Sequence, residues 1–187
     1  NHYREDNSCW HVVDYDPETG DIIEKVTHQG ISDKSAWARG QAWGLYGYTM
    51  CYRLTQDERF LMQAGKIADY LLNHPNLPED MVPYWDFDAP GIPNEPRDAS
   101  AGAIMASALL ELSEYRDLGA KYFIAAEKIL KALASDDYLA TAGSNNNFIL
   151  KHSVGNKPGN SEVDVPLSYA DYYFLEALLR YKKLKGD

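Results

Sequence analysis

Amphipathic helical segments come in pairs along this chain, and long polar loops separate one pair from the next. The predicted helices span 36–54, Thr55 to Pro75, 98–115, 117–134 and 168–184. The first helix of each successive unit begins near residue 36, 98 or 168, a spacing of roughly 60–70 residues that exceeds the common short solenoid repeats. Tandem helix pairs favour an all-α fold, in which inner helices are ringed by outer ones as in an α/α toroid.

Polar residues at the starts of these segments indicate the helix boundaries. We expect Ser35 to cap the first helix, and the capping box Thr55-Gln56-Asp57-Glu58 to open the second. Asp98 or Ser100 opens the third, which is crowded with small residues and is therefore expected to be a buried inner helix. The pattern Ser168-x-x-Asp171 opens the fifth.

Three segments interrupt the helical pattern. Residues 10–26 alternate apolar and polar residues around a Pro-Glu-Thr-Gly-Asp turn, which predicts a short β-hairpin near 12–24. Residues 76–97 and 135–167 are expected to be long irregular loops. Because long loops inside a compact domain are usually functional, two at equivalent places predict one functional rim.

The length of 187 residues is suitable for a single domain, and we expect residues 1–187 to form one. Five helices are too few to close a toroid. The chain begins at Asn1, and its first residues, NHYREDNSCWH, resemble neither a signal peptide nor a transit peptide. We therefore expect the chain to be the C-terminal portion of a larger barrel domain, whose remaining helices lie upstream.

Composition excludes several classes of protein. An apolar fraction of 45% with 25% charged residues is ordinary for a globular protein, and no apolar run reaches the roughly 18 residues that a membrane span needs. The net charge of −10 argues against a nucleic-acid partner. Cys9 and Cys51 make no disulfide framework. The 14 Tyr and 4 Trp offer flat faces with polar tips, which suit sugar rings as well as cores.

The segment Trp37-Ala38-Arg39-Gly40-Gln41-Ala42-Trp43 is the densest candidate site. Arg39 and Trp43 are four residues apart, so they share one helix face. A guanidinium beside an indole can grip a carboxylate with two hydrogen bonds and stack on a ring, and Gly40 lets a ligand approach the backbone. The alternative is a buried tryptophan covered by an arginine. Arg97 is a second candidate for a positive site.

Histidines flank the predicted hairpin, in Trp10-His11 and in His28-Gln29. A histidine near a carboxylate can tune a general acid or hold a water molecule. If both segments lie at the rim, His11 and Gln29 belong to the site. The alternative for each histidine is a structural role.

Asp86 and Asp88 in the first long loop are a candidate pair of catalytic carboxylates. Alternating residues of an extended segment point in opposite directions, however, so the two need not meet. The alternative is that Asp86 and Asp88 hold the loop in place while Asp98 caps a helix.

No metal or cofactor is predicted. The segment from Asp14 to Glu18 resembles the start of a calcium loop, but Gly20 falls one place late and Lys25 stands where a glutamate is needed. The sequence also lacks the zinc-protease, CxxC, GxSxG, P-loop and GxGxxG patterns.

The segment WARGQAW resembles glycoside hydrolase family 88, the unsaturated glucuronyl hydrolases. Further similar segments follow in the family's order: WHVVD at 10–14, THQG at 27–30, PYWDFDAPGIP at 83–93, PRDASA at 96–101 and SYADYYFLEAL at 168–178. The related family 105, the unsaturated rhamnogalacturonyl hydrolases, has glycine where Ala42 stands, which favours family 88. The resemblance implies an (α/α)6 barrel and a bacterial protein, periplasmic or cytoplasmic.

The resemblance also implies an activity, the removal of a 4,5-unsaturated uronic acid from the non-reducing end of an oligosaccharide made by a lyase. The family's catalytic aspartates precede the segment that matches His11, and Asp6 is too close to be one of them. The residues that the resemblance places in the substrate pocket are His11, Gln29, Trp37, Arg39, Trp43 and Tyr169. The expected partners are the unsaturated oligosaccharide and the N-terminal half of the same barrel.

Three alternatives stay open at this point. One is an enzyme acting on unsaturated rhamnogalacturonan fragments, and another is a non-catalytic sugar-binding remnant. The third is a different α/α enzyme such as a sugar epimerase, which would need paired histidine bases on inner helices.

Overall fold

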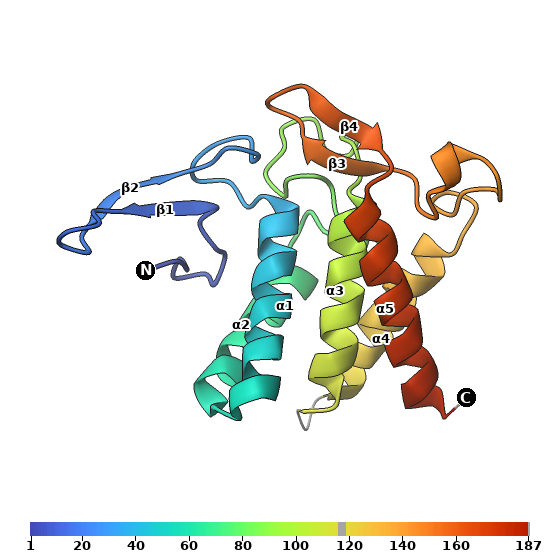
Figure 1. Ribbon diagram of the computed structural model, residues 1–187, viewed down its shortest axis with the longest axis horizontal. Helices are drawn as coiled ribbons and strands as arrows, with labels where there is room; N and C mark the ends of the chain where they lie inside the picture. The colour runs from blue at the N-terminus through green and yellow to red at the C-terminus, as the bar shows by residue number, and fades with distance from the viewer. Residues whose placement is uncertain (116–118, 187) are drawn as a thin grey trace.

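Three helices, α1 (Ala38–Thr55), α3 (Ala99–Ser113) and α5 (Ser168–Lys185), lie side by side in one layer of the structure (Figure 1). The structure is a computed structural model and describes residues 1–115 and 119–186. Two further helices, α2 (Glu58–Leu72) and α4 (Gly119–Leu133), pack behind α1 and α3. The predicted arc of helix pairs is thus present, with α1, α3 and α5 as its inner helices.

Small side chains make α3 the centre of this arc. Every residue from Ala99 to Leu112 is buried, because α3 contacts α1, α4 and α5 at once. The fit is close at Gly102, where an added Cβ would lie 3.3 Å from Val82 Cγ1 and 3.7 Å from Ile129 Cγ2. The stretch of small residues therefore allows the neighbouring elements to approach α3 closely, as the sequence predicted.

The outer helices are amphipathic, and each buries one apolar stripe. In α2 the stripe consists of Leu61, Ala64, Gly65, Ile67, Ala68 and Leu71. Full burial of one leucine or isoleucine side chain contributes roughly 1.5–3 kcal/mol. Hydrophobic burial of these stripes therefore holds the outer helices against the inner layer.

The capping residue of α2 differs from the sequence prediction. The predicted box from Thr55 is wrong, because Thr55 is the last residue of α1 and its hydroxyl donates to the Cys51 carbonyl. Asp57 caps α2 instead, with its carboxylate accepting from the Arg59 N–H at 2.9 Å. Gln56 makes the sharp turn between the helices with a positive φ of 56°, and such a turn leaves no room for the box.

Asp98 caps α3 as predicted, whereas Ser35 and Asp171 form hydrogen bonds with loop segments. The Ser35 hydroxyl donates to the Ser32 carbonyl and to Asp86, so the prediction that it caps α1 is wrong. The N-cap of α5 is Leu167, so the prediction that Ser168 opens this helix as a cap is wrong, and the Asp171 carboxylate in the first turn accepts from the amides of Ile149 and Leu150. The predicted helix 117–134 is present as α4, and its first two residues lie outside the described residues.

Two antiparallel hairpins accompany the helices. The predicted one is confirmed as β1 (Val12–Tyr15) and β2 (Ile22–Val26), with Val12 opposite Val26. The second, β3 (Ser153–Asn156) and β4 (Ser161–Val165), lies in the segment 135–167 that was expected to be irregular. That segment also contains a 3-10 turn at Asn145–Asn147. Strand β3 is short and rich in turn residues, and in β4 the alternation is limited to Val163 and Val165 with Glu162 and Asp164, which is too short to stand out in a long polar segment.

The N-terminal ends of α1, α3 and α5 all point to the same end of the molecule, at the top of Figure 1. The long segments that precede these helices, and the hairpin β3–β4, lie at that end. We call this end the rim. Among the residues that the structure describes, no helix has the length and apolarity to span a membrane.

Candidate functional site

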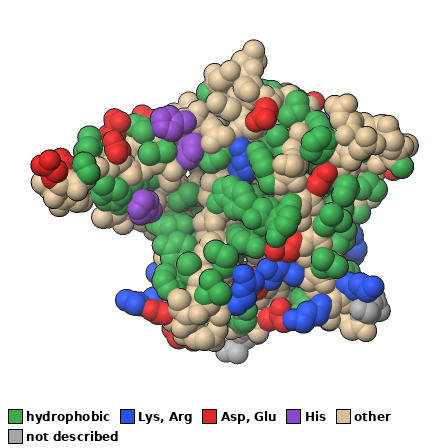
Figure 2. Space-filling view, viewed as in Figure 1, with side chains coloured by type: hydrophobic (Ala, Val, Ile, Leu, Met, Phe, Trp, Pro, Cys, Tyr) green, Lys and Arg blue, Asp and Glu red, His purple; other side chains and the backbone are tan. Residues whose placement is uncertain are grey.

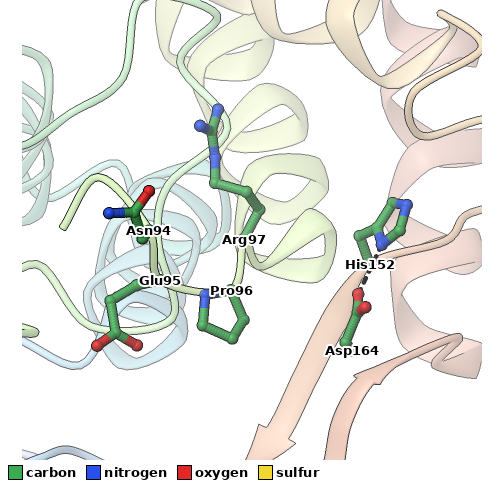
Figure 3. A pocket seen from close by; sticks show the side chains of 6 residues that line it. All are labelled: Asn94, Glu95, Pro96, Arg97, His152 and Asp164. Atoms are coloured by element: carbon green, nitrogen blue, oxygen red, sulfur yellow. Dashed lines mark hydrogen bonds and ion pairs between the residues drawn. The ribbon is translucent and has the colours of Figure 1, made fainter. Parts of the chain in front are cut away.

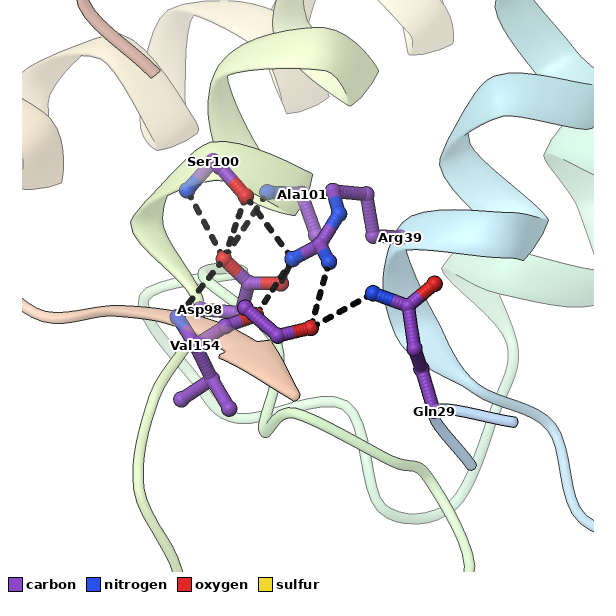
Figure 4. Close-up of polar contacts among 7 residues, drawn as sticks. Gln29, Arg39, Asp98, Ser100, Ala101 and Val154 are labelled. Atoms are coloured by element: carbon purple, nitrogen blue, oxygen red, sulfur yellow. Dashed lines mark hydrogen bonds and ion pairs between the residues drawn. The ribbon is translucent and has the colours of Figure 1, made fainter. Parts of the chain in front are cut away.

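Arg39 lies in the first turn of α1, at the rim, and its guanidinium is buried (Figure 4). Nη1 donates to Asp98 Oδ2 at 3.0 Å and to the Val154 carbonyl, and Nη2 donates to the Gly155 carbonyl at 2.8 Å. The side chains of Arg39 and Asp98 are only 4% and 0% exposed. The two charges therefore neutralise each other inside the protein.

Aromatic rings enclose this guanidinium. Its Cζ lies 4.6 Å from the ring centre of Trp37 and 5.3 Å from that of Tyr169. Trp37 is itself buried against Trp85 and Val154. Trp37 is thus the buried tryptophan covered by an arginine that the alternative interpretation described. Tyr169 is half-buried, and this burial raises the pKa of its hydroxyl. The structure leaves Arg39 and Trp37 with little surface of their own.

Gln29 and His11 lie next to this cluster. Gln29 Nε2 donates to the Gly155 carbonyl at 2.7 Å. The His11 ring lies over Trp37, with the ring centres 4.3 Å apart, and its Nδ1 accepts from the His28 N–H at 3.2 Å. The structure therefore brings His11, Gln29, Trp37 and Arg39 together at the rim.

The surroundings of His11 favour its neutral form. Burial, and then the nearby charges of His28 and Arg39, lower the pKa of His11 below its usual value of 6.5. Because Nδ1 accepts a backbone N–H, the hydrogen is assigned to Nε2. His11 is thus a neutral hydrogen-bond donor through Nε2.

An aromatic layer lies one helical turn below the rim. Trp43 and Tyr46 come from α1 and Tyr173 from α5, with ring centres 5.0 Å apart for Trp43–Tyr173 and 5.1 Å apart for Tyr46–Tyr173. Figure 2 shows hydrophobic side chains gathered in the middle of this face, over α1, α3 and α5. Partly exposed rings at such spacing can pack against the face of a sugar.

A charged layer, which the sequence analysis missed, follows below the aromatic layer. Glu111 of α3 is buried and binds Arg53 of α1 at 3.1 Å and Arg180 of α5 at 2.6 Å. Glu176 accepts hydrogen bonds from Ser107 and, at 3.1 Å, from Tyr46. The helical period could have indicated Arg53, since it continues the face of α1 that carries Arg39 and Trp43.

Asp86 and Asp88 hold loops, as the alternative interpretation expected. Asp86 Oδ2 accepts from the Ile31 N–H at 3.0 Å and the Ser35 hydroxyl at 2.7 Å, and Asp88 Oδ2 accepts from the Ala36 N–H at 2.8 Å. Burial raises the pKa of Asp86 above its usual range. These carboxylates join the segment before α1 to the segment before α3.

Near the turn of β1–β2, Asp16 Oδ1 accepts from the amides of Glu18 at 2.8 Å and Thr19 at 2.9 Å. Its carboxylate therefore stabilises the turn. Within residues 1–115 and 119–186, no three side chains of the metal-binding types converge on a site that could hold a metal ion.

The chain is similar to curated and solved proteins along almost its whole length. It is 50% identical to an unsaturated glucuronyl hydrolase of Formosa agariphila over 182 residues, which cover 97% of this chain and 45% of that protein. It is 38% identical to an unsaturated chondroitin disaccharide hydrolase of Streptococcus agalactiae, covering 96% of this chain and 46% of that protein. No protein-family profile matches the chain.

Among solved structures, an unsaturated glucuronyl hydrolase specific for heparin matches with a TM-score of 0.99 at 56% identity, covering 100% of this chain and 50% of that one. The unsaturated glucuronyl hydrolase of Bacillus sp. GL1 matches with a TM-score of 0.90 at 36% identity, covering 97% of this chain and 48% of that one. The chain thus spans about half the length of the relatives it matches.

These similarities define the class first: the helix pairs match part of the α/α toroid found in unsaturated glucuronyl hydrolases. Within that class, the resemblance indicated by WARGQAW is confirmed, because the relatives are unsaturated glucuronyl hydrolases, glycoside hydrolase family 88.

Proposed function

We propose that this chain is part of a hydrolase that removes a 4,5-unsaturated uronic acid from the non-reducing end of lyase-generated oligosaccharides. The observation that carries the proposal is the 50% identity to a curated unsaturated glucuronyl hydrolase across 97% of the chain. The rim supports it, since His11, Gln29 and Arg39 are neighbours there.

The groups at the rim are suitable for a flat, anionic ring. His11 supplies a neutral donor, and the aromatic layer of Trp43, Tyr46 and Tyr173 supplies apolar faces. The N-terminal ends of α1, α3 and α5 point to the rim (Figure 1), and helix N-termini carry a partial positive charge that favours anions. We infer that His11, Gln29, Trp43 and Tyr169 line the substrate pocket, with Trp37 and Arg39 supporting it from behind.

The reaction is hydration of a vinyl ether. A carboxyl group donates a proton to C4 of the C4=C5 bond, water adds to the positive centre that develops at C5, and the carboxylate left behind takes a proton from that water. The resulting hemiketal opens and releases the rest of the sugar. Asp86, Asp88 and Asp98 are engaged with backbone amides, a serine or Arg39, so we infer that the proton comes from a carboxyl outside this chain.

We propose that residues 1–187 form one domain with the N-terminal half of the same barrel. The relatives are about twice as long as this chain, which supports a larger barrel. One face of α5 also exposes Tyr172, Leu175 and Leu179, which are 59%, 47% and 69% exposed. A further helix packed there would bury this stripe.

The substrate class that we propose is an unsaturated disaccharide from a glycosaminoglycan. The 56%-identical solved relative is described as specific for heparin, and a variant of the Streptococcus agalactiae enzyme has been crystallised with dGlcA-GalNAc6S. Both descriptions concern glycosaminoglycans, whose uronic acids are anionic.

The test follows the ultraviolet absorbance of the conjugated C4=C5 carboxylate, using the protein as its gene encodes it and the 187-residue chain alone. We expect the absorbance to fall only with the former, because the chain alone lacks the proton donor. A saturated disaccharide is the blank. Full turnover by the chain alone would overturn the assignment of the donor and direct attention to Asp86, Asp88 or Asp98, and no turnover by either protein would reject the proposed function.

A further inference from the structure

One backbone oxygen, the Gly155 carbonyl of β3, receives two side-chain donors at the rim. Arg39 Nη2 donates to it at 2.8 Å, and Gln29 Nε2 donates to it at 2.7 Å (Figure 4). Arg39 comes from α1 and Gln29 from the segment before it. The Gly155 carbonyl thus joins hairpin β3–β4 to both.

Asp98 anchors the other side of the guanidinium. Its carboxylate pairs with Arg39 at 3.0 Å and accepts from the Ser100 N–H at 3.1 Å and the Ser100 hydroxyl at 2.5 Å. The Val154 N–H also donates to Asp98, at 3.5 Å. A continuous series of hydrogen bonds therefore runs from the N-cap of α3 through Arg39 and Gly155 to Gln29.

This series of hydrogen bonds determines how the Gln29 amide is oriented. Because Nε2 donates to a carbonyl, which can only accept, Oε1 must point away from it. Figure 4 shows the amide nitrogen of Gln29 directed along its hydrogen bond and the amide oxygen on the other side of the group. The amide thereby offers an acceptor, which suits a sugar hydroxyl.

We propose that Arg39 is a positioning residue, which fixes the Gly155 carbonyl and through it both hairpin β3–β4 and the orientation of Gln29. The inference rests on the proposed function. It differs from the expectation that Arg39 grips the substrate's carboxylate itself. Such a contact would have to reach a guanidinium that is 4% exposed and whose charge Asp98 already neutralises, and drawing it away from Asp98 would leave a buried charge uncompensated, which is strongly unfavourable.

The base of the hairpin is held by other contacts. His152 Nδ1 lies 2.6 Å from Asp164 Oδ1, and the Ala99 N–H donates to the His152 carbonyl at 2.9 Å. Figure 3 shows His152 and Asp164 facing the segment 94–97 across a cavity of about 340 Å³. We therefore expect the hairpin to stay attached when Arg39 is changed, while its strand around Gly155 loses its fixed position.

The experiment uses the protein as its gene encodes it, with the variants Arg39→Lys, Gln29→Ala and both together. Lysine keeps the charge but cannot reach Asp98, Val154 and Gly155 at once. We expect Arg39→Lys to speed amide hydrogen exchange across residues 153–165 and to lower kcat/KM roughly 10-fold or more. Because Arg39 acts through Gln29, the double variant is expected to lose little more than the more damaging single variant.

The matched control is Arg59→Lys, since Arg59 also pairs with an N-cap aspartate, Asp57, but on the exposed start of α2. It should leave both measurements unchanged. If the losses from Arg39→Lys and Gln29→Ala multiply, and exchange in 153–165 stays at the wild-type rate, Arg39 contacts the substrate and the inference is overturned.

The exchange measurement needs no substrate, so it tests the positioning of the hairpin even if the wild-type protein proves inactive. Inactivity would reject the proposed function alone. Should Arg39→Lys fail to fold, Gln29→Ala decides, because it removes the second donor to the Gly155 carbonyl. Faster exchange around Gly155 in that variant supports the inference, and an unchanged rate contradicts it.

Discussion

Arg39 and Gln41 stand two residues apart at the start of α1 and hold different segments. Arg39 binds the carbonyls of β3, whereas Gln41 pairs with both the N–H and the carbonyl of Cys9, at 2.7 and 3.1 Å. The sequence singled out this segment as a candidate site, and that role stays a prediction. It could not assign these contacts, because residue type does not tell which distant backbone group a donor will meet.

Replacing Gln41 with leucine is expected to destabilise the protein. Gln41 is 1% exposed, and leucine would leave the N–H and carbonyl of Cys9 without their partner. An unsatisfied buried polar group costs about 1–3 kcal/mol. Urea unfolding checks this, and an unchanged midpoint with an unchanged slope would contradict the role of Gln41.

Replacing Arg39 with alanine is expected to lower the free energy of unfolding, although Arg39 lies at the rim and not in the hydrophobic core. Asp98 would be left buried without its partner, and breaking a buried ion pair in this way costs about 3–5 kcal/mol. The change is measured by urea unfolding. Arg59→Ala, at an exposed pair, is the control and should remain close to wild type. Equal stability of the two variants would speak against a buried pair.

The stability of the protein should fall as the pH drops below 6.5, in part because of His11. The folded state lowers the pKa of His11 below that value, so the unfolded chain binds a proton there that the folded chain does not. Its contribution is complete above pH 6.5 and is lost as the pH falls through the folded-state pKa. Burial lowers the pKa of His74 in the same direction. Urea titrations above and below pH 6.5 should therefore show a smaller pH dependence in His11→Gln, and an undiminished one would contradict the assignment.

At the scale of elements, helical periodicity located the five helices that the structure describes, and the β1–β2 hairpin was recognised from its alternation. The hairpin β3–β4 was missed because its apolar alternation is limited to Val163 and Val165 of β4, and because partners distant in sequence, such as Arg39 and Gln29, hold it in place. Asp57 was passed over as a cap because Thr55 fits the local pattern equally well. The positive φ of Gln56 ends α1 at Thr55, and Asp57 therefore caps α2.

The tight packing of α3 leads to a prediction at Gly102. A leucine there would meet Val82 and Ile129, since even a Cβ would lie 3.3 Å from Val82. Overpacking of this kind costs about 1–3 kcal/mol. Gly47→Ala in α1 is the control, because a Cβ there meets nothing within 4 Å and alanine favours helix. Gly102→Leu should unfold at a lower urea concentration than wild type, and a midpoint at or above that of Gly47→Ala would contradict the close packing.

At the scale of the whole molecule, the rim, the aromatic layer and the charged layer follow one another down the face formed by α1, α3 and α5. Figure 2 shows this order, with hydrophobic side chains in the middle and charged ones below. From the sequence, Trp43 is expected to line the substrate pocket, and that role stays a prediction. The charged layer needs three helices in register, since Glu111, Arg53 and Arg180 come from three different ones.

The exposed stripe on α5 predicts self-association of the isolated 187-residue chain. Leu175 and Leu179 are 47% and 69% exposed together with Tyr172, and an apolar stripe of this kind favours association. Light scattering after size exclusion should give a mass above 21.1 kDa, and Leu175→Lys with Leu179→Lys should lower it. The control is Ile124→Lys on α4, at 64% exposure. A monomer at every concentration would refute the prediction.

The backbone contacts of Arg39 and Gln41 in WARGQAW affect how this motif can be used to recognise distant relatives. Arg39 and Gln41 bind segments of the chain's own backbone, so selection would keep them wherever the scaffold must assemble. A descendant that had lost its proton donor would still need both residues to fold. The motif is therefore a record of common ancestry, and a genome survey that searches for it would collect inactive descendants together with working enzymes.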